Sequence, residues 1–139
     1  MRVNKLVTMA SISGFRNLWP QAAEAQWKIQ GLMYIANTRT NQQMPLKSTL
    51  LADLDAHPAR LNVLEKASAI KQPWLIIHGD ADVPIPPTHA EALKTVQPGA
   101  ELLVMHGADH TFGAAHPWGK DTLPLPLEQF CERVVQFFK

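Results

Sequence analysis

The sequence predicts an α/β fold in which a short parallel sheet of about three strands lies between helices, a three-layer αβα arrangement. Residues 74–77 form an unbroken apolar run between Pro73 and Gly79, as is typical of a strand covered on both faces. From this run onward the pattern alternates strand, helix, strand, helix, which is characteristic of parallel sheets. A second short apolar run, in residues 5–10, fits another buried strand.

The segment between these two runs is less regular. Pro20 suits the first position of a helix, which we expect to extend to about residue 36. Residues 37–45 are polar and expected to be irregular. The sequence therefore predicts one domain over residues 1–139, with a helical, lid-like insertion around residues 20–45.

Helix signals are clearer further along the chain. Ser48 is placed to cap a helix, and the spacing from Thr88 to Glu91 is that of a capping box at the start of another. Residues 101–105 are expected to form the next strand. The helix that Ser48 caps is expected to carry Leu50, Leu51 and Leu54 on one side. The last helix of the chain is expected to have one apolar face, made of Leu127, Phe130, Cys131, Val134, Val135 and Phe138.

The composition argues against two large classes of partner. The chain has 139 residues with 13 basic and 12 acidic side chains, a net charge of +1, which favours neither nucleic acid nor an anionic membrane surface. No apolar run approaches the ~20 residues that a membrane span needs. The lone cysteine, Cys131, cannot form an internal disulfide, which fits a reducing, cytoplasmic compartment.

Polar clusters follow the two later predicted strands. Residues 78–82 (His-Gly-Asp-Ala-Asp) come after one strand, and residues 106–113 come after the other. In a parallel sheet these loops emerge at the same edge, so we expect Asp82 and His110 to lie within side-chain reach of each other. A carboxylate that orients an imidazole is the pair that activates a nucleophile, because the acid fixes the imidazole tautomer.

These loops carry a family resemblance. Residues 73–82 resemble the strand and acid loop of α/β-hydrolases, especially those akin to dienelactone hydrolases and prolyl-oligopeptidase-type enzymes, and residues 107–112 resemble the histidine loop. The resemblance implies that Asp82 is the triad acid and His110 the triad histidine. It further implies hydrolysis of a small carboxylic ester, lactone or related acyl substrate through an acyl-enzyme, with no cofactor.

The family's nucleophile is not found in the sequence. In these enzymes the serine lies on a G-x-S-x-G turn upstream of the acid. None of the serines in this chain has that context; they are Ser11, Ser13, Ser48 and Ser68. We therefore expect a truncated hydrolase, the C-terminal half of the fold, without nucleophile or oxyanion loop and inactive alone.

Other interpretations of the same residues stay open. Asp80 is expected to form a turn, and His78 and His106 to make local hydrogen bonds. A metal site could draw on His78, Asp80, Asp82, His106, Asp109, His110 and His116, but they lack the fixed spacings that zinc favours. A non-enzymatic alternative is a half-fold that binds a partner or itself. In either case the resemblance implies that the strand in residues 6–10 lacks its neighbour and has an unpaired edge, which predicts a homodimer or larger homo-oligomer.

Overall fold

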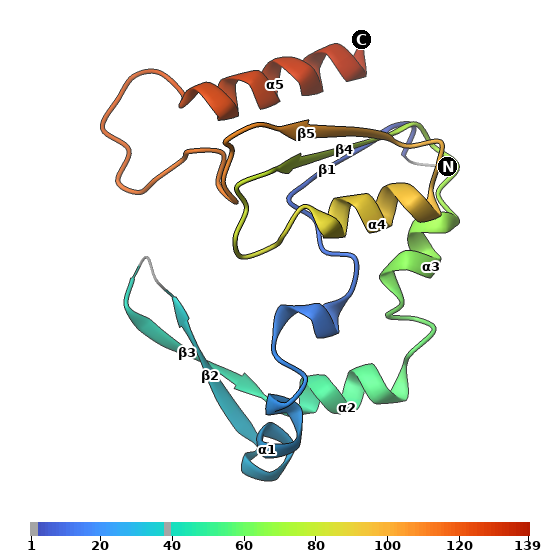
Figure 1. The fold of residues 1–139 in the computed structure, drawn as a ribbon, viewed down its shortest axis with the longest axis vertical. Coiled ribbons are helices and arrows are strands. Elements are labelled where there is room, and N and C mark those ends of the chain that lie inside the picture. The colour runs from blue at the N-terminus through green and yellow to red at the C-terminus, as the bar shows by residue number, and fades with distance from the viewer. Residues whose placement is uncertain (1–2, 38–39) are drawn as a thin grey trace. The chain divides into compact units, whose positions relative to one another are not determined.

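The computed structural model describes residues 3–37 and 40–139, which form two compact units (Figure 1). The first unit combines the chain up to Phe15 with residues 63–139, and the second comprises residues 16–62. A short 3-10 helix, η1 (Phe15–Leu18), begins at the last residue of the first segment. We describe each unit by itself.

The first unit is built on a three-stranded parallel sheet. Its strands are β1 (Leu6–Met9), β4 (Trp74–Gly79) and β5 (Glu101–Met105), in the order β1-β4-β5. Every residue of the central strand β4 is buried. β4 and β5 pair in parallel with Gly79 opposite Met105, so both strands end at the same level. The predicted parallel sheet is confirmed, and the loops that follow β4 and β5 start side by side.

Helices cover both faces of this sheet (Figure 1). Side chains alternate along β4, so Trp74 and Ile76 pack with α3 (Val63–Ser68) and α4 (Thr88–Val96). Leu75 and Ile77 pack on the opposite face, against the apolar side of α5 (Leu125–Phe138). The predicted three-layer αβα arrangement is confirmed.

Two details of these helices differ from prediction. The capping box at Thr88 is wrong: the residue before α4 is Pro87, and no side chain caps the helix. The preceding prolines start the helix one residue early, since the Glu91 N–H already bonds to the Pro87 carbonyl. In α5, the side chains packed against the sheet are Leu127, Phe130, Val134 and Phe137. The predicted face is wrong at its C-terminal end: Phe137 packs on the sheet in place of Phe138, and Val135 and Phe138 are more than half exposed.

The second unit contains less helix than predicted. Helix α1 (Ala23–Gln30) ends where Gly31 adopts a left-handed φ of 73° and donates its N–H to the Trp27 carbonyl. The chain then forms an antiparallel hairpin of β2 (Leu32–Asn37) and β3 (Gln42–Lys47). The helix expected to reach residue 36 is wrong, because it ends at Gln30. The irregular segment expected at 37–45 is wrong at Asn37 and over 42–45, which lie in strands, while its residues 38–39 lie outside the described residues.

Helix α2 (Thr49–Ala56) follows the hairpin and matches the prediction more closely. Ser48 occupies the residue before the helix, although its side chain makes no capping bond. Leu51 and Leu54 are buried. Trp27 is the largest fully buried side chain of this unit and donates its indole N–H to the Leu46 carbonyl at 2.9 Å. This buried ring and its hydrogen bond hold α1 against the hairpin and form the core of the unit.

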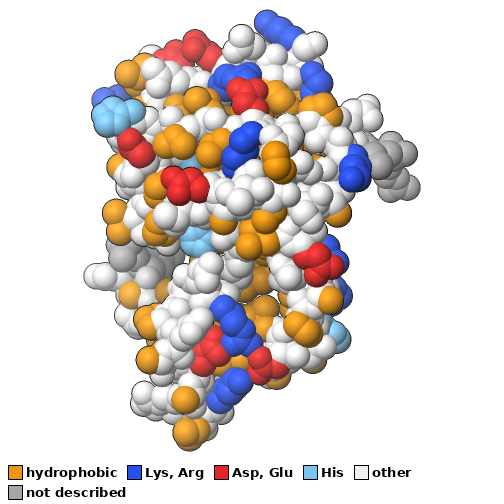
Figure 2. Space-filling model, turned by 45° about the vertical axis from the view of Figure 1, so that its right-hand side comes forward, with side chains coloured by type: hydrophobic (Ala, Val, Ile, Leu, Met, Phe, Trp, Pro, Cys, Tyr) orange, Lys and Arg blue, Asp and Glu red, His pale blue; other side chains and the backbone are white. Residues whose placement is uncertain are grey.

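Charge is evenly distributed on the visible surface. On the face drawn in Figure 2, acidic and basic side chains of the described residues are interspersed, with no large patch of one sign. This agrees with the net charge of +1. A polyanionic partner would find no concentrated positive field on this face.

Gly79 generates the first prediction. A Cβ at this position would lie 2.0 Å from the backbone oxygen of Ala108, so any side chain forces the two loops apart. We expect Gly79→Ala to lower the free energy of unfolding by about 1–3 kcal/mol or more, measured by urea titration. Gly119→Ala is the matched control, because nothing lies within 4 Å of its Cβ position. Equal stability of the two variants would contradict the close approach.

Candidate active site

Asp82 and His110 meet at the carboxyl edge of the sheet. Asp82 follows β4, His110 follows β5, and His110 Nδ1 lies 2.8 Å from Asp82 Oδ2. The Asp82 side chain is fully buried, whereas 40% of the His110 side chain is exposed. The hydrogen bond expected from the sequence is therefore present, with the acid shielded from water and the imidazole accessible.

A tight turn holds the Asp82 carboxylate in place. The Ile85 backbone N–H donates to Asp82 Oδ1 at 2.8 Å. His78, the fifth residue of β4, has its Nε2 2.7 Å from the Ile85 carbonyl and 3.3 Å from Asp82 Oδ2. The local hydrogen bond expected of His78 is present. Both carboxylate oxygens thus have partners, and Oδ2 faces His110.

The histidine loop is anchored on both sides of His110. Ala108 and Phe112 are fully buried, and the Phe112 ring lies 5.5 Å from that of Phe130 in α5. Asp109 accepts hydrogen bonds from the backbone N–H groups of Thr111 and Gly113, which hold its pKa below the ordinary range, the Gly113 bond contributing most. Together these contacts fix the backbone on which His110 sits.

The loop ends at a second close approach. Gly113 has a φ of 79°, and a Cβ there would lie 3.1 Å from the Cβ of Pro124, just before α5. The histidine loop therefore closes against the start of the helix that covers its side of the sheet.

Asp80 ties the two loops together. Its carboxylate accepts a hydrogen bond from His106 Nδ1 at 2.7 Å and another from the Gly107 N–H at 2.6 Å. These bonds, with that from His106 the larger, hold the pKa of Asp80 below its ordinary value. The sequence predicts that Asp80 forms a turn within its own loop; its carboxylate instead bonds to the loop that follows β5. The hydrogen bond expected of His106 is present. The His106 side chain is almost fully exposed.

Ser13 and His89 form a buried pair that the sequence did not predict. The Ser13 backbone N–H lies 3.0 Å, and its hydroxyl oxygen 2.9 Å, from His89 Nδ1. Burial lowers the pKa of His89, the nearby imidazole of His78 adds to this shift, and Asp82 opposes it. Because 76 residues separate the partners, no spacing in the sequence signals the contact.

The hydrogen bonds define what His110 can do. A carboxylate only accepts, so His110 must donate from Nδ1, which leaves the Nε2 lone pair free in the neutral ring. That nitrogen can take a proton from a nucleophile, and Asp82 would stabilise the resulting imidazolium. An imidazole held in this way can act as a general base, with the carboxylate as the acid that orients it.

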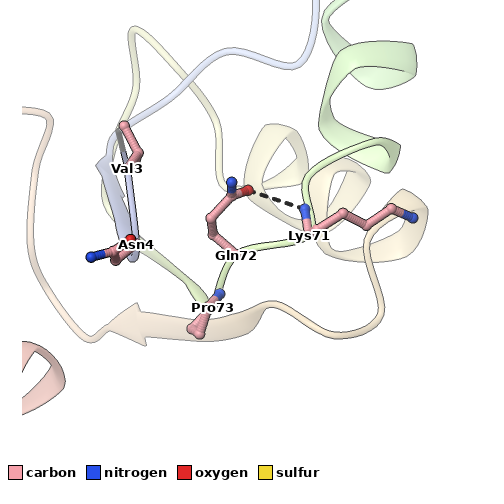
Figure 3. A pocket seen from close by; sticks show the side chains of 5 residues that line it. All are labelled: Val3, Asn4, Lys71, Gln72 and Pro73. Atoms are coloured by element: carbon pink, nitrogen blue, oxygen red, sulfur yellow. Dashed lines mark hydrogen bonds between the residues drawn. The ribbon is translucent and has the colours of Figure 1, made fainter. Parts of the chain in front are cut away.

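Other kinds of site find less support in the described residues. No group of three or more His, Cys, Asp or Glu side chains among residues 3–37 and 40–139 is placed to bind a metal ion. The helices in that same part of the chain are too short or too polar to cross a membrane. The pocket in Figure 3 lies at the amino ends of β1 and β4, the edge opposite Asp82 and His110, and is lined by Val3, Asn4, Lys71, Gln72 and Pro73. It has no part in the candidate site.

Comparison with known proteins identifies the fold. The sequence matches no protein-family model and no curated protein. The structure is similar to a monoacylglycerol lipase from Paleococcus ferrophilus, with a TM-score of 0.64 and 17% identity over 98% of this chain and 58% of that one. It is also similar to Est1E from Butyrivibrio proteoclasticus, with a TM-score of 0.59 and 16% identity over 98% of this chain and 50% of that one.

A third similar structure is an α/β-hydrolase enzyme from the metagenome of lagoon sediments at Mar Chica, Morocco, with a TM-score of 0.51 and 20% identity over 96% of this chain and 50% of that one. The chain thus has a partial α/β-hydrolase fold. It spans about half the length of these solved structures. At such identities the similarity establishes the fold, and the roles of Asp82 and His110 stay predictions.

The buried His89 generates a prediction about pH. Because its pKa is lower in the folded chain than the ordinary 6.5, the unfolded chain binds more protons as the pH falls below about 6.5. The free energy of unfolding should therefore decrease on acidification, by at most about 1.4 kcal/mol per pH unit for one proton. In His89→Gln this slope should be shallower, as measured by urea titrations between pH 7 and pH 5.

An exposed histidine supplies the control. His57, in the second unit, has a half-exposed side chain that lies 3.5 Å from Asp53 Oδ1, so His57→Gln tests whether loss of a histidine outside the core changes the slope as much as loss of His89 does. If His89→Gln and His57→Gln both show the same pH dependence as the native chain, the inference that His89 is buried in its neutral form is wrong.

Proposed function

We propose that this chain supplies the acid and the histidine of a hydrolase that cleaves a carboxylic ester or related acyl bond. In this proposal Asp82 orients His110, and His110 Nε2 acts as general base for a serine that lies outside these 139 residues. One observation carries the proposal: the 2.8 Å hydrogen bond from His110 Nδ1 to the buried Asp82, at the carboxyl edge of a partial α/β-hydrolase fold.

The proton transfers that such a reaction needs are compatible with the geometry of His110. The serine hydroxyl would give its proton to His110 Nε2 as its oxygen attacks the acyl carbon, and the imidazolium would then protonate the leaving alcohol. Water, deprotonated by the same nitrogen, would release the acid and restore the serine. Because 40% of the His110 side chain is exposed, groups that do not belong to the described chain can reach the ring.

The substrate class is inferred from the similar structures and from the two loop sequences. The similar structures include an enzyme named a monoacylglycerol lipase, and Est1E was solved with ferulic acid bound. Residues 73–82 and 107–112 favour the dienelactone hydrolase and prolyl-oligopeptidase-like branch of the family. We propose a small acyl ester as the substrate, with no cofactor.

Activity measurements test this function. The 139 residues alone should hydrolyse p-nitrophenyl acetate no faster than free imidazole does, and a fluorophosphonate should label no serine. The protein encoded by the full reading frame that contains them should hydrolyse the ester. In that protein, Asp82→Asn should lower kcat by about four orders of magnitude, because the wrong His110 tautomer would be favoured. His106→Gln, at an exposed histidine that also bonds to a carboxylate, should leave kcat unchanged.

Two results would contradict the proposal. One is a fluorophosphonate adduct on Ser13 in the 139-residue chain, which would make the buried Ser13–His89 pair the reactive one. The other is full activity of the longer protein carrying Asp82→Asn, which would remove Asp82 from the mechanism.

A second candidate function, self-association, has one observation in its favour. β1 is an edge strand that pairs with β4 on one side, and no other strand of the described residues lies beside its second edge. Its residues are only partly buried, and Met9 is 43% exposed. Exposed edge strands readily pair with a second copy of the same strand.

Light scattering coupled to size-exclusion chromatography tests this candidate. Pairing through β1 predicts a dimer or larger oligomer of the 15.5 kDa chain at tens of micromolar. The N–H groups of Leu6 and Ala10 bond to β4 or the residue before it, so the alternate N–H of Met9 faces the free edge. Met9→Pro removes that N–H and should shift the equilibrium towards monomer if the edge is the interface. A stable monomer of the native chain over that concentration range would rule the candidate out.

A further inference from the structure

His78 is a fully buried imidazole next to the candidate acid. Its side chain has no exposed surface, and its Nε2 lies 2.7 Å from the Ile85 carbonyl and 3.3 Å from Asp82 Oδ2. Its other ring nitrogen, Nδ1, has no hydrogen-bond partner among the described residues. These contacts define which nitrogen carries the ring proton.

The proton must be on Nε2. A backbone carbonyl can only accept, so the 2.7 Å contact with Ile85 requires an N–H at that nitrogen. Nδ1 is buried and unpartnered, and a proton there would be a donor without an acceptor, which is more costly than an unused lone pair. His78 is therefore the Nε2–H tautomer, donating to Ile85 and directed at Asp82 as well.

Two hydrogen bonds connect His78 to Asp82 through the backbone of Ile85. His78 Nε2–H donates to the Ile85 carbonyl, and the N–H of the same Ile85 donates to Asp82 Oδ1. Ile85 is thus held from both sides of its backbone, by the end of β4 and by the carboxylate. With Oδ1 occupied in this way, Oδ2 is the oxygen that remains for His110.

We propose that His78 is a positioning residue, which acts through the 82–85 turn to aim Asp82 Oδ2 at His110. This inference rests on the proposed function for its purpose, since an aimed acid matters only if His110 is a base. The geometry itself is independent of any reaction. The competing explanation is a buried histidine that contributes only to packing and stability.

Proton NMR of the native 139-residue chain separates the two explanations. The Nδ1 proton of an imidazole bonded to a carboxylate resonates far downfield of the amide protons. Because His78 Nε2 also lies 3.3 Å from Asp82 Oδ2, the resonance is assigned to His110 only if it is lost in His110→Gln as well as in Asp82→Asn. If His78 positions the acid, His78→Leu should remove or shift this resonance upfield. His78→Gln, whose amide N–H can still donate towards Ile85, should retain it.

His89→Gln is the matched control. His89 is also a buried histidine of the same unit, but its hydrogen bonds go to Ser13 and not to Asp82 or Ile85. Its replacement should destabilise the fold without displacing the His110 resonance. A merely structural role for His78 predicts the same behaviour for His78→Leu, so an unmoved resonance in a folded His78→Leu variant would overturn the inference.

A measurement on the native chain covers the case in which His78→Leu does not fold. Nitrogen-15 spectra of the histidine rings report which nitrogen of His78 is protonated, and a coupling across the hydrogen bond would connect it to the Ile85 carbonyl. A protonated Nδ1 would overturn the inference. A native chain without any downfield His110 resonance would overturn the proposed function together with it, whereas a resonance that ignores His78 would overturn the inference alone.

Discussion

The buried carboxylate of Asp82 is the constraint on which the rest of this unit depends. A carboxylate removed from water is costly unless its oxygens accept hydrogen bonds, and here the donors come from two different loops. Those loops can meet only if their strands end level, as the pairing of Gly79 with Met105 provides. The absence of a side chain at Gly79 then lets the loops cross within contact distance. Sheet register, glycine and loop geometry therefore serve one buried group.

Three histidines lie near this carboxylate, and their imidazole rings differ in hydrogen bonding. His110 donates from Nδ1, His78 donates from Nε2, and His89 accepts at Nδ1 from the Ser13 backbone. Only the first of these rings is substantially exposed. The same side chain is thus an exposed donor, a buried donor or a buried acceptor, according to which backbone and side-chain groups surround it.

The sequence was informative where local pattern and chain order determine structure. The apolar run of β4 and the polar clusters after β4 and β5 predicted the sheet and the meeting of Asp82 with His110. It was misleading where one residue changes the outcome: Gly31 ends α1 and turns the following apolar residues into a strand. It was silent on the contact of Ser13 with His89, because that contact depends on packing between segments far apart in the chain.

The contact between Gly113 and Pro124 has a consequence for how this protein can vary or be engineered. The residues between them, 114–123, form neither helix nor strand and are mostly exposed, while both ends of the segment are held together. Loops anchored in this way tolerate changes of length at low entropic cost. A fluorescent reporter or an affinity handle could be spliced into this segment, because the histidine loop and α5 are each secured by contacts outside it.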